Sequence, residues 1–168
     1  MRKAAILILC ILFATAVLAA EAKKPLSPSA KAEATLNGKK VTIDYNAPSK
    51  RNRAIMGKLV PYGKVWRTGA NAATTLTTGT DLMLGSIHVP AGKYTLYTIP
   101  GEKEWTLIVN KQTGQWGTNY DEKQDLGRTK MSVATVKKPV ETLAITIDKS
   151  NLTLSWENTS ASVPVMVH

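Results

Sequence analysis

Residues 143–156 read LAITIDKSNLTLSW, and this stretch carries the strongest indication of the fold. Apolar side chains alternate with polar ones on both sides of the polar residues 148–151. The apolar positions are Leu143, Ile145, Ile147, Leu152, Leu154 and Trp156. Strict alternation is typical of a strand with one buried face, and a short polar break is typical of a turn. The stretch therefore predicts an antiparallel hairpin.

The same alternation recurs through much of the chain. It is found at residues 41–45, 82–89, 94–99, 105–109, 131–135 and 163–167. Turn signals such as Asn37-Gly38 and Pro90-Ala91-Gly92 punctuate these segments. No segment after the first two dozen residues has helical periodicity. The pattern predicts an all-β domain with little or no helix, folded as a single antiparallel β-sandwich of jelly-roll or immunoglobulin-like type.

The first two dozen residues have the pattern of a secretory signal peptide. Arg2 and Lys3 precede an uncharged, mostly apolar run over residues 4–18, and alanines follow it. The run is shorter than the roughly 20 residues of a membrane-spanning helix. We expect a signal peptide over residues 1–20, cleaved after Ala19, Ala20 or Ala22, and a single β-rich domain over residues 23–168. The expected location is periplasmic or secreted, with no membrane span in the mature protein.

Removing the signal peptide changes what chemistry the chain can offer. Cys10 is the only cysteine of the 168 residues and would leave with the peptide. The mature domain then has no disulfide, no thiol nucleophile and no thiolate metal site. We expect no cofactor and no bound metal.

Positive charge is concentrated in one half of the chain. The whole sequence carries +10, and residues 23–67 contain 11 Lys or Arg against two acidic residues. From residue 70 onward, nine basic residues balance nine acidic ones. Such asymmetry favours anionic partners, and outside the cytoplasm these are acidic glycans or envelope components rather than nucleic acid. Solubility is the alternative explanation. The sequence does not indicate an oligomeric state.

Two segments, residues 46–71 and 112–127, interrupt the succession of strands and are rich in aromatic, amide and charged side chains. Long irregular segments often carry function, and flat aromatic faces with planar donors suit glycans and carboxylates. The candidate ligand-binding residues are Arg53, Tyr62, Trp66, Arg67, Asn71, Trp116, Tyr120, Asp121 and Arg128. A purely structural role for Trp66, Arg67 and Asn71 is the alternative.

The first of these segments resembles a known signature. Residues 53–71 read RAIMGKLVPYGKVWRTGAN, and with residues 89–101, 105–111, Tyr120-Asp121 and Arg128 they resemble the bacterial domain-of-unknown-function family 2911. The resemblance covers nearly all of the mature chain. It implies an exported β-rich domain of unknown activity and supplies no catalytic residues. Ala72 stands where the resemblance leads us to expect an acidic residue after Asn71.

Enzymatic signatures are sparse. His88 and His168 are the only histidines, no His pair has metal-ligand spacing, and no Gly-x-Ser-x-Gly elbow occurs. Asp121 and Asp125 could form the carboxylate pair of a hydrolase. The sequence thus favours an extracytoplasmic binding module for an anionic or glycan-like ligand, with a carboxylate-dependent hydrolase and a structural envelope protein as alternatives. An open concave pocket that holds Arg53, Trp66, Arg67 and Asn71 would favour binding.

Overall fold

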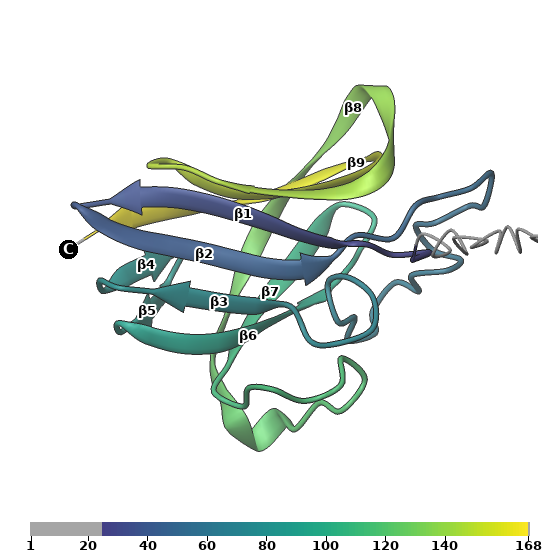
Figure 1. The fold of residues 1–168 in the computed structure, drawn as a ribbon. Coiled ribbons are helices and arrows are strands. Elements are labelled where there is room, and N and C mark those ends of the chain that lie inside the picture. Colours follow the sequence, from purple (N-terminus) through teal and green to yellow (C-terminus); the bar gives the residue numbers. More distant parts are fainter. Residues whose placement is uncertain (1–24, 168) are drawn as a thin grey trace, which may run out of the picture.

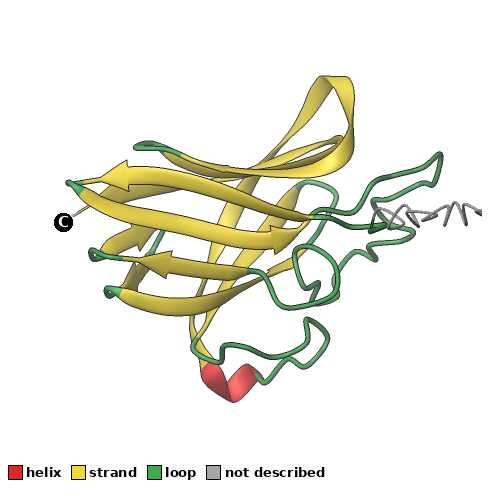
Figure 2. Cartoon of the chain, in the orientation of Figure 1, coloured by secondary structure: helices red, strands yellow, loops and turns green. Residues whose placement is uncertain are grey.

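The computed structural model describes residues 25–167. The predicted signal peptide and its three cleavage sites lie outside the described residues. Nine strands and one short 3₁₀-helix follow one another along the chain (Figures 1 and 2). They are β1 (Ser29–Leu36), β2 (Lys39–Asn46), β3 (Thr75–Thr78), β4 (Leu82–Leu84), β5 (Ile87–Val89), β6 (Gly92–Ile99), β7 (Glu104–Asn110), η1 (Glu122–Gln124), β8 (Asp125–Ile147) and β9 (Asn151–Val167).

The strands form one antiparallel sheet in the order β1-β2-β3-β6-β7-β8-β9-β4-β5. Within residues 25–167, η1 is the only helical element, so the prediction of an all-β domain with little or no helix is confirmed. The assignment to a jelly-roll or immunoglobulin-like sandwich stays a prediction, because hydrogen bonds connect all nine strands into one sheet. No helix in the described part of the chain has the length and apolarity to cross a membrane.

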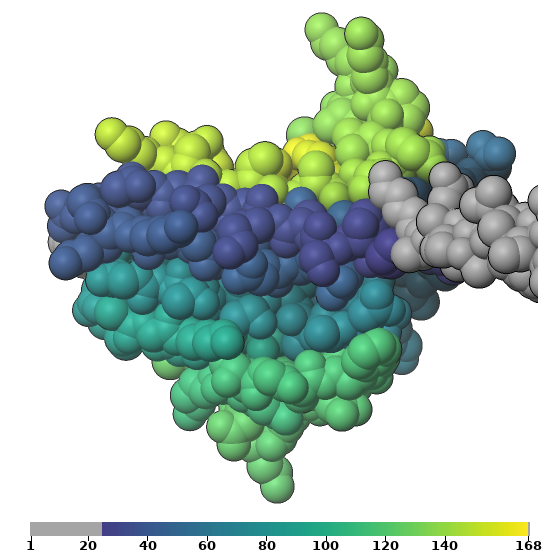
Figure 3. Space-filling model, viewed as in Figure 1, coloured from purple at the N-terminus to yellow at the C-terminus, as the bar shows by residue number. Residues whose placement is uncertain are grey.

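The hairpin predicted from residues 143–156 is the end of β8 and the start of β9. Ile147 pairs with Leu152 and Ile145 with Leu154. The two long strands pair again nearer the body of the sheet, and between the two paired regions residues 136–143 of β8 lie opposite residues 156–158 of β9. The longer segment bulges out as an arch, which projects from the rest of the surface (Figure 3).

β9 changes the phase of its alternation opposite this arch. Its buried side chains occupy even positions up to Trp156 and odd positions from Ala161 onward. Glu157, between them, has a left-handed backbone with φ of 55°. An irregularity of this kind moves the inward set from one residue parity to the other. Both halves of β9 can therefore face the same core.

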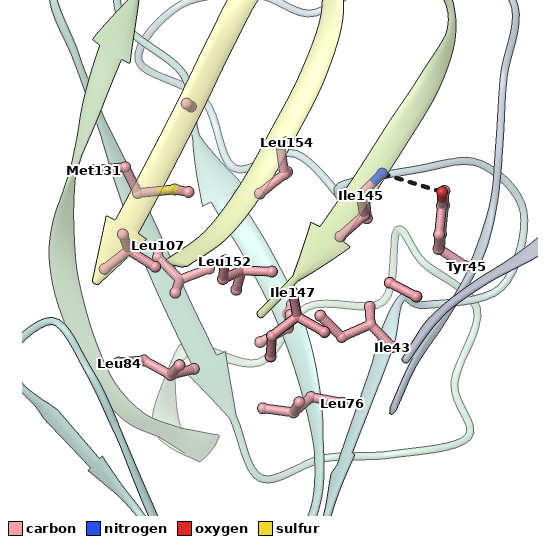
Figure 4. Close-up of a cluster of buried hydrophobic side chains, with 14 of the residues drawn as sticks. Ile43, Tyr45, Leu76, Leu84, Leu107, Met131, Ile145, Ile147, Leu152 and Leu154 are labelled. Carbon is pink, nitrogen blue, oxygen red and sulfur yellow. Dashed lines mark hydrogen bonds between the residues drawn. The ribbon is translucent and has the colours of Figure 1, made fainter. Parts of the chain in front are cut away.

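One hydrophobic cluster receives side chains from all nine strands. Figure 4 shows its middle, where Leu107 and Met131 approach Leu152 while Ile43 and Leu76 lie near Ile147. Burial of these side chains supplies the main stabilisation of a domain that has no disulfide.

Two long connections are joined to each other. The β2–β3 connection spans residues 47–74 and the β7–β8 connection includes residues 111–121. The backbone N–H of Ala73 donates to the Gln115 carbonyl at 3.2 Å, and the N–H of Gly117 donates to the Asn71 carbonyl at 2.9 Å. The two irregular segments noted in the sequence therefore form one continuous surface.

Candidate functional site

A pocket of about 730 Å³ lies where these two connections meet the sheet. Its walls come from the segment before β1, from both connections, and from single positions in β6 and β9. The lining residues are Leu26, Ser27, Pro48, Arg51, Arg53, Leu59, Val60, Val65, Trp66, Arg67, Gly69, Ala70, Asn71, Tyr97, Gly117, Thr118, Tyr120 and Trp156. Five predicted ligand residues line it, namely Arg53, Trp66, Arg67, Asn71 and Tyr120.

The charged side chains of the pocket are all of one sign. Arg51, Arg53 and Arg67 line it, and no Asp or Glu among residues 25–167 does so. Guanidinium groups stay protonated at all relevant pH values and present donors in a planar fork. The pocket therefore carries a fixed positive potential that favours anions.

Two of the arginines, Arg51 and Arg53, also form hydrogen bonds with backbone carbonyl groups. Arg53 donates from Nε to the Lys50 carbonyl at 3.0 Å and from Nη2 to the Ser49 carbonyl at 2.7 Å. Arg51 donates from Nη2 to the Leu26 carbonyl, which ties the segment before β1 to the β2–β3 connection. Each guanidinium has five N–H donors, so both retain donors beyond these contacts.

Arg67 is the least engaged of the three. Its side chain is half-buried, and its Nε lies 3.4 Å from the Gly69 carbonyl, a long contact. No carboxylate within residues 25–167 forms a salt bridge with it. The aliphatic part of the Arg67 side chain packs against the Gly117 backbone. A Cβ added to Gly117 would lie 2.6 Å from the Cδ of Arg67. Packing thus holds the aliphatic part of Arg67, while most of the N–H donors of its guanidinium group remain available.

Trp66 belongs both to the pocket wall and to the packed interior. Its ring stacks on Trp156 with centroids 5.9 Å apart, and it meets Trp105 edge-on at 6.2 Å. Its backbone forms a bridge with Thr98, with N···O distances of 2.7 and 3.0 Å. Aromatic pairs in these geometries stabilise beyond their buried area. The structural interpretation of Trp66 thus agrees with its packing, and its role in ligand binding stays a prediction.

The turn after Trp66 holds unusual backbone conformations. Thr68 and Asn71 have φ of 56° and 59°, and Thr68 is fully buried. A β-branched residue with positive φ is strained and persists only when its surroundings enforce it. Here the Thr68 hydroxyl lies 3.1 Å from the Thr98 hydroxyl, and the Thr74 hydroxyl donates to the Thr68 carbonyl at 2.9 Å. These contacts hold the backbone of the residue that follows Arg67.

The second connection contributes Tyr120, which is held by a polar network. The Tyr120 hydroxyl donates to Asp125 Oδ2 at 2.7 Å and accepts from Arg128 Nη2 at 2.8 Å. Burial of the ring and the Asp125 carboxylate raise the pKa of Tyr120 to about 12. Arg128 also donates to Asp125 at 2.9 Å and to Glu122 at 2.7 Å. Tyr120 is therefore a neutral, fixed part of the pocket wall.

The remaining predicted residues lie outside the pocket lining. Arg128 is engaged in the network around Tyr120, and Asp121 Oδ1 accepts the Lys123 N–H at the start of η1. Tyr62 packs beside Gly57, and the exposed Trp116 bridges to Ala72.

The two carboxylates considered for hydrolysis are both engaged locally. Asp125 Oδ1 accepts from the buried Asn110 amide at 2.9 Å, and its Oδ2 accepts from Tyr120 and Arg128. Asp121 caps η1. No group of three metal-ligating side chains occurs in the stretch from residue 25 to residue 167.

Sequence reasoning missed several lining residues. Arg51 lies two positions from Arg53 in a stretch without acidic residues, and that charge pattern could have indicated it. Tyr97 and Trp156 lie in alternating strands, where nothing local distinguishes a pocket-lining ring from a core ring. Leu26 precedes the first strand and reaches the pocket through the Arg51 contact.

Comparison with known proteins gives a family match. A family model described as "Protein of unknown function (DUF2911)" matches residues 27–165. No curated protein and no solved structure matches the chain.

Proposed function

The chain belongs to the DUF2911 family of proteins of unknown function, and from its own pocket we propose that it is an extracytoplasmic binding module for an anionic or glycan-like ligand. The observation that carries the proposal is the pocket's set of three arginines without an acidic lining residue. Its volume of about 730 Å³ falls within the roughly 300–1,000 Å³ typical of small-molecule sites.

The aromatic side chains support the same function. The half-buried rings of Trp66 and Tyr120 give the pocket apolar surface beside the guanidinium groups. Sites of this composition hold a ligand's apolar part by burial and orient its charged part by a few polar contacts. No observation favours a carboxylate-dependent hydrolase, because Asp121 and Asp125 are occupied by local hydrogen bonds.

We also propose that the protein is exported through the signal peptide predicted over residues 1–20. Mass spectrometry of the protein purified from its native source is expected to give an N-terminus between Ala20 and Lys23. Recovery of a mature form that still begins at Met1 would contradict export by cleavage.

Replacing Arg67 with Lys tests the binding site. The variant keeps the charge but loses the planar fork, so we expect affinity for anionic probes such as phosphate and glucuronate to fall on the order of tenfold. Unfolding free energy should change by less than about 0.5 kcal/mol, because the only hydrogen bond lost is long. Thermal shift and calorimetric titration measure the two quantities.

Arg128→Lys is the matched control for that experiment. Arg128 lies outside the pocket lining and is bonded to Asp125, Glu122 and the hydroxyl of the pocket-lining Tyr120, so its replacement is expected to lower stability and to change affinity less than Arg67→Lys does. If Arg67→Lys lowers the melting temperature strongly and leaves anion affinity unchanged, Arg67 is structural and the proposed site is wrong.

A further inference from the structure

Exposed apolar side chains gather around the cationic pocket. Six large hydrophobic side chains are exposed in residues 25–167, and five of them lie on the segments that build the pocket or flank it. Leu26, Leu59 and Val65 line the pocket itself and are 69%, 47% and 39% exposed. Exposed apolar side chains gathered at one place are typical of an interaction site.

We call Leu26, Leu59 and Val65 the apolar rim of the pocket. Basic residues are interleaved with it. Residues 45–80 contain six Lys or Arg and no acidic residue. Lys58 directly precedes Leu59, Lys64 directly precedes Val65, and both lysines are exposed. Arg51 bonds to the carbonyl of Leu26. Each apolar residue of the rim therefore has a cation beside it.

We propose that the pocket mouth docks on an anionic phospholipid bilayer, with a lipid phosphate among the arginines and with Leu26, Leu59 and Val65 in the boundary between headgroups and acyl chains. This inference rests on the proposed function, because the lipid phosphate is the anion that the pocket binds. Cationic residues attract the surface, and adjacent apolar side chains insert into it.

The arrangement fits a lipid better than a soluble sugar. Carbohydrate rings stack on open aromatic faces, whereas Trp66 has one face covered by Trp156 and the exposed Tyr62 and Trp116 lie outside the pocket lining. The exposed aliphatic side chains of the rim offer no partner for a hydroxyl-rich ligand, but they match acyl chains. Loops carrying the rim lie together at one end of the molecule, away from the turn between β1 and β2 at the other end (Figure 1).

Vesicle sedimentation tests the inference on the mature protein. The probes are phosphatidylcholine vesicles with and without phosphatidylglycerol, and soluble glycerol phosphate is followed in parallel by thermal shift. We expect binding to the anionic vesicles only. The double variant Leu59→Ser/Val65→Ser should bind them about tenfold more weakly while keeping its affinity for glycerol phosphate. Both side chains are exposed, so its melting temperature should stay near that of the wild type.

Two control variants separate specific docking from general attraction. Met166→Ser removes an exposed apolar side chain on β9, paired with β4 outside the pocket lining, and should leave vesicle binding unchanged. Arg67→Gln should lose both vesicle and glycerol phosphate binding, whereas Lys93→Gln on β6 should keep both.

The outcomes distinguish this inference from the proposed function. Glycerol phosphate binding without vesicle binding overturns the membrane inference and leaves the anion site standing. Absence of both overturns both. Vesicle binding that is equally weakened by Arg67→Gln and Lys93→Gln, or unaffected by the rim variant, reflects net charge alone and also overturns the inference.

Discussion

Replacing Trp156 with Ala is expected to lower the free energy of unfolding by about 3–5 kcal/mol, the range for truncation of a buried tryptophan. The side chain is 2% exposed and stacks on Trp66. Its Nε1 donates to the Glu141 carbonyl at 3.2 Å, and the same carbonyl accepts the Lys50 N–H at 2.7 Å. The substitution therefore opens a cavity and loosens the base of the β8 arch against the pocket turn. Small domains have only about 5–15 kcal/mol of stability, so the loss is severe.

Urea denaturation measures this loss, and Trp156→Phe separates its two parts. Phenylalanine keeps an aromatic ring against Trp66 but has no N–H donor, so we expect a smaller loss of about 1–2 kcal/mol. The Glu141 carbonyl would still accept from Lys50 in that variant. A Trp156→Ala domain within 1 kcal/mol of the wild type would show that the tryptophan stack does not hold the pocket to the sheet.

The strands that the sequence predicts best are those whose inward residues are large. The end of β8 and the start of β9 follow from alternation of Leu and Ile, and β2 follows from Val41, Ile43 and Tyr45. β1 escaped prediction because three of its inward positions are alanines, which are weak strand formers. β3 is nearly all threonine, and Leu76 is its only aliphatic side chain in the core.

The length of β8 could not be read from the sequence. Alternation indicates a short strand at residues 131–135 and another at 143–147, whereas the structure joins them through the arch into Asp125–Ile147. Pairing with β9 on one side and β7 on the other makes this continuity possible. Such partners lie far away in sequence, so local pattern carries no information about them.

The sequence predicted only part of the candidate site, because local pattern carries no information about partners that lie far away in sequence. Arg53, Trp66, Arg67 and Asn71 fall in one short stretch of unusual composition, and the pocket includes all four. Arg128 and Asp121 have equally suitable chemistry, but local partners occupy them: Arg128 pairs with Asp125, and Asp121 caps η1. Composition identifies residues able to bind a ligand, whereas tertiary contacts decide which of them remain available.

Replacing Gly117 with Ala is expected to abolish most anion binding by separating the two connections that form the pocket. A Cβ at this position would lie 2.6 Å from Arg67 Cδ and 2.7 Å from the Asn71 carbonyl oxygen. Rotation of the Arg67 side chain can move its Cδ away, but its Cβ, at 2.9 Å, moves only with the backbone, and the Asn71 carbonyl can retreat only by breaking its bond with the Gly117 N–H. We expect affinity for phosphate to fall more than tenfold, and stability to fall by about 1–3 kcal/mol as in other overpacked sites.

Gly114→Asn is the matched control in the same connection. Gly114 has φ of 81° with open space around its Cα, and asparagine tolerates that left-handed conformation, so binding and stability should change little. Phosphate affinity of Gly117→Ala equal to that of the wild type would contradict the proposed pocket geometry.

A double-mutant cycle with Arg67→Ala identifies which contact opposes the Gly117 methyl group. In the Arg67→Ala background the obstruction by Cδ is gone, whereas the Asn71 carbonyl oxygen at 2.7 Å and the Cβ of residue 67 at 2.9 Å remain. A stability loss from Gly117→Ala that stays the same in both backgrounds assigns the obstruction to the Asn71 carbonyl together with the Cβ of residue 67, which an alanine keeps. A loss that largely disappears assigns it to the aliphatic part of the Arg67 side chain beyond Cβ. In the second case Gly117 is small so that the guanidinium can reach the ligand, which would make it a positioning residue for Arg67.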